Sequence, residues 1–287
     1  MKVLPGLFFI LIMHKNNLYA GLFQYMDLSD TLKKFKNGEI SLNEAERHVK
    51  LNGYENLSNM ARVDICRAKR TGIPEAIIAD CKTCNDVVSI ARAQIKSEGR
   101  SIITRVSDEH YRNLDSLAHE MDMDIRWSEL ARVAVIGAPA EKTGGRIGVI
   151  SAGTADIPVA EEAKEIAIEM GCTVNTLYDV GVAGIHRLFP ELGRLVSEGM
   201  DAVVVAAGRE GTLPSIIAGL VDVPVIGVPV STGYGAGGKG EAALLSMLQS
   251  CSVLAVVNID AGFVAGAFAA RIANLAARNR NESYNLK

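Results

Sequence analysis

Residues 208–215 read G-R-E-G-T-L-P-S, residues 225–241 read V-I-G-V-P-V-S-T-G-Y-G-A-G-G-K-G-E, and residues 256–263 read V-V-N-I-D-A-G-F. Around them lie three short apolar runs bounded by Gly, Pro or Asp, which is typical of buried strands: 202–207, 223–230 and 253–258. Helix-length segments rich in Ala, Leu and Met separate these runs, so we predict a parallel sheet covered by helices. Ligands of such sheets bind at the carboxyl ends of the strands, where the quoted glycines and polar residues fall.

The same pattern extends toward the N-terminus of this half. Residues 146–150 and 173–178 read as two further strands, each followed by a helix. Pro158 suits the first turn of one helix, and Gly171 and Gly199 suit the ends of the two. With a small-residue helix at 262–277, the segment 141–287 is predicted to be a three-layer domain of five βα units.

The preceding half predicts a smaller α/β domain at 26–140. Its expected strands and helices are 73–78, 101–106 and 131–136, and 87–96 and 108–119. Ser29 and Ser41 are candidate helix N-caps, the second in a capping box with Glu44. A Gly- and Pro-containing linker at 137–145 marks the predicted boundary.

Residues 1–25 form a separate segment. The apolar run 7–13 resembles the start of a signal peptide, but His14 and Lys15 end it well short of the roughly 20 residues that a spanning helix needs. Met26 opens a segment of ordinary composition. We therefore expect residues 1–25 to be an upstream extension that belongs to neither domain.

Composition narrows the class of protein. The 287 residues carry a net charge of −3 and are 48% hydrophobic, so we expect neither a nucleic-acid surface nor a membrane protein. The odd number of cysteines indicates a reduced, cytoplasmic protein. Cys66, Cys81 and Cys84 could form a zinc or redox site, but a fourth ligand at suitable spacing is missing, so ordinary helix-start residues are the expectation.

A glycine-rich loop follows one predicted strand. Gly235, Gly237 and Gly240, with Asp260 at a strand end, have the spacing of a dinucleotide fingerprint. The loop belongs to the fourth βα unit, which argues against a Rossmann site. We favour a phosphate held by glycine N–H groups at a helix N-terminus, with Gly233 and Gly238 in the same loop.

Other candidates lie at the same predicted edge of the sheet. They are Ser151, Gly153, Thr154, Asp156, His186, Arg187, Arg209, Glu210 and Asn258. Each also has an ordinary structural explanation, such as a helix cap for the loop 151–156 or a surface ion pair for Arg209 and Glu210. Cys251 is ambiguous in the same way, because buried cysteines are common and a helix C-terminus disfavours a thiolate.

Several of these motifs resemble one family. S-A-G-T-A-D-I-P-V-A-E-E-A, V-A-G-I-H-R-L, G-R-E-G-T-L-P-S and S-M-L-Q-S-C followed by V-V-N-I-D-A-G-F resemble the LarB family, the pyridinium-3,5-biscarboxylic acid mononucleotide synthases of nickel-pincer cofactor biosynthesis. The resemblance covers residues 26–278. The C-terminal half is also similar to the PurE carboxylases and mutases of purine biosynthesis. Ala261, Val264 and a segment one residue short after Cys251 depart from the LarB pattern.

The resemblance implies an activity. It implies carboxylation of the pyridinium ring of nicotinic acid adenine dinucleotide with CO₂ or bicarbonate, followed by hydrolysis that releases AMP. By analogy, Cys251 would be the nucleophile and Glu210 the base, with His186 and Asp156 as acid–base or positioning groups. The resemblance further implies Mg²⁺ at the diphosphate, although no ligand cluster is evident, and a homo-octamer.

Two other functions remain open. A PurE-type enzyme would act on an aminoimidazole ribonucleotide without a thiol. A non-catalytic nucleotide-binding regulator would tolerate loss of both Cys251 and Glu210.

Deleting residues 1–25 is expected to leave a soluble protein with undiminished activity, because the segment belongs to neither predicted domain. Fractionation and assay of the full-length and shortened chains test this. Membrane retention of the full-length chain that disappears on truncation would contradict the prediction.

Overall fold

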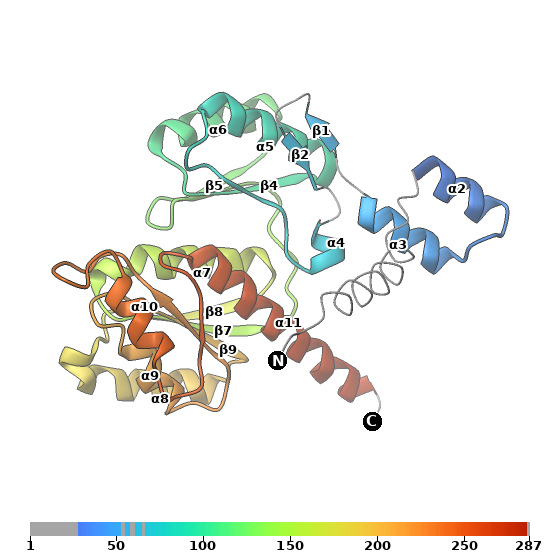
Figure 1. Cartoon of the computed structure of the whole chain (residues 1–287). Coiled ribbons are helices and arrows are strands. Elements are labelled where there is room, and N and C mark those ends of the chain that lie inside the picture. The colour runs from blue at the N-terminus through green and yellow to red at the C-terminus, as the bar shows by residue number, and fades with distance from the viewer. Residues whose placement is uncertain (1–27, 53–54, 58–60, 65–66, 286–287) are drawn as a thin grey trace, which may run out of the picture. The chain divides into compact units, whose positions relative to one another are not determined.

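The computed structural model describes residues 28–52, 55–57, 61–64 and 67–285 (Figure 1). The chain divides into two compact units, 1–55 and 56–287. The described part of the first contains helices α2 (Leu28–Lys36) and α3 (Leu42–Asn52). Ser41 and Glu44 form the predicted capping box, with the Glu44 N–H donating to Ser41 Oγ at 3.2 Å and the Ser41 N–H donating to Glu44 Oε2 at 2.9 Å.

Two N-terminal expectations have different outcomes. Ser29 lies inside α2, because Leu28 before it is already helical, so its predicted N-cap role is wrong. Residues 1–27 lie outside the described residues, and the expectation for 1–25 stays a prediction.

The second unit contains the predicted parallel sheet of five strands. These are β7 (Arg146–Ser151), β8 (Thr173–Leu177), β9 (Ala202–Ala207), β10 (Val225–Pro229) and β11 (Ala255–Val256). The helices that follow them in turn are α7 (Ile157–Glu169), α8 (Leu188–Glu198), α9 (Leu213–Ala218), α10 (Glu241–Leu248) and α11 (Gly262–Asn285). The five βα units are therefore confirmed, with Pro158 in the first turn of α7.

The strand order determines where a ligand can enter. Across the sheet the order is β8-β7-β9-β10-β11, and every neighbouring pair is parallel. The chain thus moves one way from β7 to β8 and the other way from β9 onward. In doubly wound sheets of this order, the crevice at the reversal point, here between β7 and β9, is the usual ligand site.

A second, mixed sheet of four strands precedes this one. Its order is β3 (Ala76–Ile78), β4 (Arg100–Thr104), β6 (Val133–Gly137) and β5 (Ile125–Ser128), and β3–β4 is its parallel pair. Helices α5 (Cys84–Glu98) and α6 (Asp108–Glu120) cover one face. Three of the four strands match the prediction. β5 was not predicted, and its Trp127 stacks on Tyr111 of α6 with ring centroids 5.0 Å apart.

The remaining elements of this unit are short. Helix α4 (Arg67–Thr71) precedes β3, and β1 (Glu55–Leu57) pairs with β2 (Ala61–Val63). In the part of the chain that the structure describes, no helix is long and apolar enough to cross a membrane.

Helices α7 and α11 share a core with both sheets. Val133 and Val135 of β6 join the same buried cluster as Val149 of β7 and Val204 of β9. The alternate β6 residues, Ala134 and Ile136, pack with α5 and α6 instead. The two-residue period of a strand thus gives β6 two apolar faces. Because the sheets share a core, 56–287 is one compact unit, and the predicted domain boundary at 140 stays a prediction.

Helix α7 also presents buried glutamates to the four-stranded sheet. Both Arg100 and Arg126 form ion pairs with Glu169, and Arg126 lies 3.4 Å from Glu165. Thr104 donates a hydrogen bond to Glu162. Buried carboxylates are tolerated only with such partners, so these pairs fix how α7 meets the sheet.

The predicted small-residue helix, α11, packs closely against α7 where the two helices cross. A Cβ atom on Gly262 would lie 2.5 Å from the Val159 carbonyl oxygen, and one on Gly266 would overlap the Ala163 carbonyl. Both obstacles are backbone atoms, so neither can turn aside.

We expect Gly266→Ala to lower the free energy of unfolding by about 1–3 kcal/mol or more, because the methyl group forces α7 and α11 apart. Gly193→Ala in α8 is the matched control, since a Cβ there meets nothing within 4 Å. The control should stabilise the protein by about 0.5–1 kcal/mol. Denaturant unfolding measures both, and equal effects would contradict the close approach.

Candidate active site

The loops that follow β7, β8, β9 and β10 enclose a cavity at the reversal point of the sheet. Its volume is about 600 Å³. The lining includes Gly153, Thr154 and Asp156 after β7, Asp179 and Arg187 after β8, Arg209 and Glu210 after β9, and Thr232 and Tyr234 after β10. Six of these nine residues were sequence candidates, contributed by three separate loops.

Asp156 is the centre of this cavity's hydrogen bonding. It ends a short 3-10 turn, Thr154–Asp156, and is 5% exposed. Its carboxylate accepts from the Gly153 N–H at 2.8 Å, the Gly208 N–H at 3.1 Å and the Thr232 hydroxyl at 3.1 Å. Burial raises its pKa, while these three hydrogen bonds oppose that rise and the negative charge of Asp260 adds to it.

Gly208 is required for this arrangement. A Cβ atom at Gly208 would lie 2.7 Å from Thr232 Oγ1 and 3.0 Å from Asp156 Oδ1. The absence of a side chain therefore lets the backbone N–H reach the carboxylate, and ties the end of β9 to the loop after β7.

A tight turn then exposes Arg209 and Glu210 to the cavity. The Gly211 N–H donates to the Gly208 carbonyl at 2.8 Å, and Arg209 has the left-handed φ of +49°. The Arg209 guanidinium lies 4.2 Å from the centre of the exposed Tyr234 ring. Such a cation–π pair favours one position of each side chain, so it helps to hold Arg209 and Tyr234 in place at the edge of the cavity.

Arg187 and Ser151 have structural partners of their own. Arg187 forms an ion pair with Asp179 at 2.6 Å on the cavity wall. Ser151 is fully buried, and its hydroxyl accepts from the Asp179 N–H at 3.3 Å. Ser151 therefore supports the loop after β8 and does not line the cavity.

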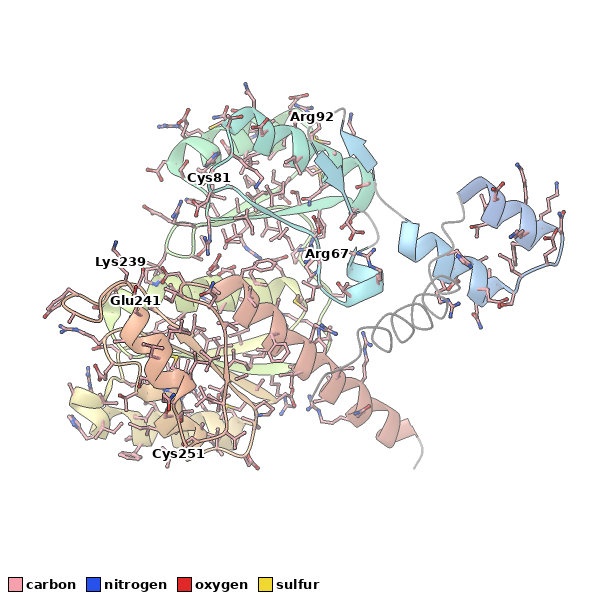
Figure 2. The ribbon with its side chains drawn as sticks, in the orientation of Figure 1. Arg67, Cys81, Arg92, Lys239, Glu241 and Cys251 are labelled. Carbon is pink, nitrogen blue, oxygen red and sulfur yellow. The ribbon has the colours of Figure 1, made fainter. Side chains whose placement is uncertain are left out.

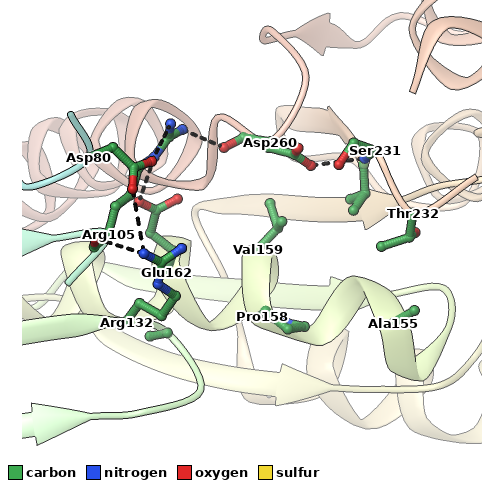
Figure 3. A pocket seen from close by; sticks show the side chains of 12 residues that line it. Asp80, Arg105, Arg132, Ala155, Pro158, Val159, Glu162, Ser231, Thr232 and Asp260 are labelled. Carbon is green, nitrogen blue, oxygen red and sulfur yellow. Dashed lines mark hydrogen bonds and ion pairs between the residues drawn. The ribbon is translucent and has the colours of Figure 1, made fainter. Parts of the chain in front are cut away.

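A second cavity of about 270 Å³ adjoins the first, and Ala155 and Thr232 line both. Figure 3 shows its charged lining, with Asp80, Arg105 and Arg132 from the four-stranded sheet and its loops and Glu162 from α7. Asp260 lines this cavity, and its carboxylate accepts from the Ser231 N–H at 2.9 Å. The four-stranded sheet thus contributes side chains next to the Asp156 cavity.

Several predicted site residues lie elsewhere. His186 and Asn258 are exposed and line neither cavity, and Asn258 Oδ1 accepts from the neighbouring Ile259 N–H at 2.9 Å. Gly233, Gly235, Gly237 and Gly238 also line neither cavity. The Gly238 N–H donates to the Gly235 carbonyl at 3.1 Å, so it is used within the turn that starts α10.

Cys251 lies at the other edge of the sheet. Helix α10 starts beside the carboxyl end of β10 and leads back, over about 12 Å for its eight residues, to the start of β11. Ser252 accordingly lies close to Gly219, which ends α9 at that edge. Figure 2 shows Lys239 and Glu241 near one end of α10 and Cys251 beyond the other. Within one chain, the expectation that Cys251 joins Glu210 and Asp156 is therefore not met.

The described residues offer no evident metal site. Among them, no three His, Cys, Asp or Glu side chains come close enough together to hold an ion. The expectation of Mg²⁺ at the diphosphate of the substrate stays a prediction. Thr83 caps α5 in a capping box with Asp86, which accounts for the position of Cys84 at the helix start, whereas Cys66 lies outside the described residues.

Comparisons with known proteins match both sheets. A model of the AIR carboxylase family matches residues 146–286, and a model of the LarB/PurE-like N-terminal domain matches residues 54–138. An uncharacterized protein of Methanocaldococcus jannaschii is 43% identical over 258 residues, which are 87% of this chain and 98% of that protein. The chain belongs to the AIR carboxylase family.

Named enzymes of this family are more distant. An N5-carboxyaminoimidazole ribonucleotide mutase of Thermotoga maritima is 32% identical over 91 residues, or 30% of this chain and 51% of the mutase. The corresponding mutase of M. jannaschii is 34% identical over 139 residues, or 47% of this chain and 82% of the mutase. These matches place the chain among carboxylase- and mutase-type enzymes.

Sequence reasoning missed several residues of this candidate site. Asp80 and Arg105 each follow a strand of the four-stranded sheet, so the rule that drew attention to Asp156 could have found them. Thr232 lies inside the glycine-rich loop, but only the glycines of that loop were predicted to bind a ligand. Arg132 carried no sequence signal, because its position depends on a left-handed φ of +53°.

Thr232→Val removes one hydrogen bond that favours ionised Asp156, so the pKa of Asp156 should rise further. At pH values above that pKa, where the carboxylate is charged, the free energy of unfolding should fall by about 1.5–3 kcal/mol. At pH values below it the loss should be smaller. Unfolding measured across pH tests this. Thr212→Val is the control, because Thr212 lines the same cavity without bonding to Asp156. A loss independent of pH would contradict the assignment.

Proposed function

We propose that this protein carboxylates the pyridinium ring of nicotinic acid adenine dinucleotide and then hydrolyses the phosphoanhydride, releasing AMP and a pyridinium dicarboxylate mononucleotide. The observation that carries the proposal is the cavity at the reversal point, where buried Asp156 is bonded to Gly208 and Glu210 lies on the adjoining turn. The AIR carboxylase match and the LarB/PurE-like N-terminal domain support CO₂ chemistry on a nucleotide.

The reaction needs a nucleophile, CO₂ and a base. A thiolate adds to the electron-poor ring, and the ring electrons that it displaces form an enamine. The enamine carbon attacks CO₂ and forms the new carbon–carbon bond. A base then removes the proton from that carbon, aromaticity returns, and the carbon–sulfur bond breaks to release the thiolate. Water completes the sequence by cleaving the phosphoanhydride.

We assign the role of the base to Glu210. Its exposed side chain lines the cavity on the turn that follows β9. Asp156 is nearly buried and already accepts three hydrogen bonds, so we assign it to hold the loops together and orient the substrate. Arg209 and Arg187 supply positive charge for the carboxylate and phosphate groups of the substrate.

The position of Cys251 adds a condition. Because it lies at the opposite edge from Glu210, its thiol can reach a ring held near Asp156 only if it comes from a second copy of the chain. Its surroundings suit such a contact, since Cys251 is exposed and Leu245, Leu248 and Val253 nearby in the sequence are 62%, 60% and 94% exposed. An assembly of copies, such as the octamer that the resemblance implies, is therefore part of the proposal.

Incubation with the dinucleotide, bicarbonate and Mg²⁺ tests the function directly, with AMP release and a mass gain of one carboxylate as the expected products. Cys251→Ser should abolish turnover because a serine hydroxyl stays protonated at neutral pH. Glu210→Gln should bind substrate normally and turn over about 10²-fold more slowly.

A mixture of the two variants tests whether the thiol comes from another copy. Coexpressed Cys251→Ser and Glu210→Gln chains should recover up to about one quarter of wild-type activity, since random two-fold pairs restore one site in four. Full activity of Cys251→Ser alone would reject covalent catalysis. No recovery in mixed assemblies would reject a thiol supplied by the second copy.

One other function has support of its own. The likeness to N5-carboxyaminoimidazole ribonucleotide mutases, together with the distance of Cys251 from the cavity, favours a purine-type reaction that uses no thiol. Turnover of an aminoimidazole ribonucleotide but not of the dinucleotide, with Cys251→Ser fully active, would establish that reaction instead.

A further inference from the structure

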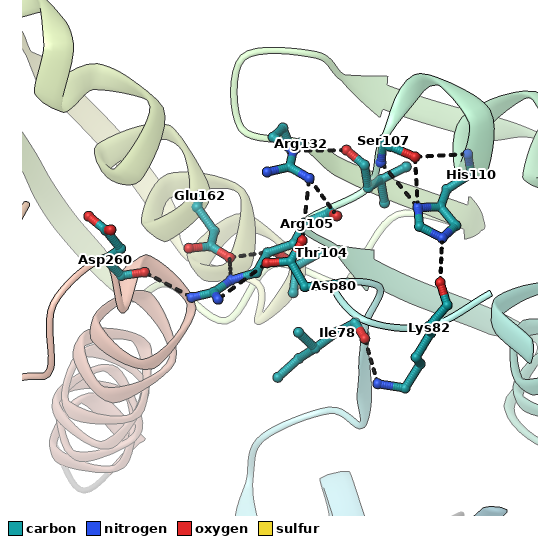
Figure 4. Close-up of polar contacts among 11 residues, drawn as sticks. Ile78, Asp80, Lys82, Thr104, Arg105, Ser107, His110, Arg132, Glu162 and Asp260 are labelled. Carbon is teal, nitrogen blue, oxygen red and sulfur yellow. Dashed lines mark hydrogen bonds and ion pairs between the residues drawn. The ribbon is translucent and has the colours of Figure 1, made fainter. Parts of the chain in front are cut away.

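The four-stranded sheet reaches the loops of the candidate active site through Arg105. This residue follows β4, and its Nη2 donates to the carbonyl oxygen of Asp260 at 3.1 Å. Its Nη1 lies 3.5 Å from Asp80, and its Nε lies 4.0 Å from Glu162 of α7. Figure 4 shows the guanidinium between Glu162 and the Asp260 backbone. One side chain thus joins the four-stranded sheet, α7 and the loop after β11.

The contact at Asp260 continues to Asp156. The Asp260 carboxylate accepts from the Ser231 N–H at 2.9 Å, and the Asp260 N–H donates to the Pro229 carbonyl at 2.9 Å. The next residue, Thr232, donates its hydroxyl to Asp156. The position of the Asp260 peptide therefore sets where Thr232, and with it the Asp156 carboxylate, is held.

The backbone at both ends of this contact is strained. Arg105 has φ +57° and Asp260 has φ +55°, a region that residues other than glycine occupy at a cost. Arg132 supports the first turn, with its Nη2 donating to the Arg105 carbonyl at 3.0 Å and its own carbonyl accepting from the Val106 N–H at 2.9 Å. Such conformations persist only where surrounding contacts hold them, and the Arg105 bond is one of those that hold Asp260.

We infer that Arg105 is a positioning residue for the reaction, which fixes the Asp260 peptide and through it the Ser231–Thr232 loop around Asp156. The inference rests on one part of the proposed function, namely that CO₂ chemistry takes place at the cavity around Asp156. It gives the four-stranded sheet an indirect part in a reaction at the carboxyl ends of the parallel strands.

Arg126 provides a matched control. It also joins the four-stranded sheet to α7, through ion pairs with Glu165 and Glu169, and it lines neither cavity. Arg126→Ala and Arg105→Ala therefore both remove ion pairs between the sheet and α7, but Arg105→Ala alone frees the Asp260 peptide. A purely structural role for Arg105 predicts the same outcome for both variants.

The first test is steady-state kinetics of the full-length protein. The substrate is the one that wild type converts, either the dinucleotide or the aminoimidazole ribonucleotide. Arg105→Ala should lower kcat by up to about 100-fold with little change in KM. The reason is that a shift of the Ser231–Thr232 loop and Asp156 by about 1 Å or less misaligns the reacting groups and slows the chemical step. Guanidinium ions added to this variant, or the conservative Arg105→Lys, should restore part of the loss. Arg126→Ala should keep the wild-type kcat.

Amide hydrogen exchange supplies a test without turnover. Peptides that contain Ser231 and Asp260 should exchange faster in Arg105→Ala than in wild type, and at the wild-type rate in Arg126→Ala. Unchanged exchange and unchanged kcat in Arg105→Ala would overturn the inference, as would equal effects in the two variants. Absence of any carboxylation by wild type would instead reject the proposed function, while the exchange result would still decide the role of Arg105.

Discussion

The burial of helix α7 between two sheets is the constraint on which the structure depends. Gly262 and Gly266 of α11 let that helix pass within backbone contact of α7, while the glutamates of α7 face the other sheet. Glu169 has a side chain only 1% exposed and is paired with two arginines of that sheet. Removing the sheet would also expose to water the apolar residues of α7 and α11 that share a buried cluster with Val133 and Val135 of β6. The parallel-sheet half is therefore not expected to be stable alone in this protein.

The same helix connects stability with chemistry. Asp156 immediately precedes α7, so whatever fixes the helix also fixes the carboxylate at its start. The strand order then brings the loop after β9 to that carboxylate, because β7 and β9 are neighbours although about fifty residues separate them. The candidate site thus depends on one topological reversal and on a glycine whose N–H can approach a buried acid.

Local sequence features were sufficient to predict the five strands of the parallel sheet and three of the four strands of the other sheet. Ala202–Ala207 is an uninterrupted apolar run, and its predicted bounds are those of β9. Asp156, Arg209 and Glu210 were also found, since each follows a strand and the carboxyl ends of parallel strands share one edge. β5 was missed because I-R-W-S alternates too briefly to give a periodic signal. Ser29 was misassigned because sequence alone does not separate an N-cap from a residue in the first turn of a helix.

The errors at the site have a common cause. Cys251 was grouped with Glu210 from their nearness to shared motifs, but a helix between them in the chain carries Cys251 to the opposite edge of the sheet. The glycines at 233–238 were read as free N–H groups, whereas the Gly238 amide is used within its own turn. Arg105 and Arg132 depend on left-handed backbone conformations and on contact between two sheets, which no local pattern reports.

The stacking of Trp127 on Tyr111 gives the molecule a built-in spectroscopic reporter. Trp127 is the only tryptophan of the chain, and it belongs to an edge strand of the four-stranded sheet. Its emission will follow the melting of that sheet alone, whereas far-ultraviolet circular dichroism is dominated by the helices around the parallel sheet. Coincidence of the two transitions is thus a direct measure of cooperativity between the halves of the molecule.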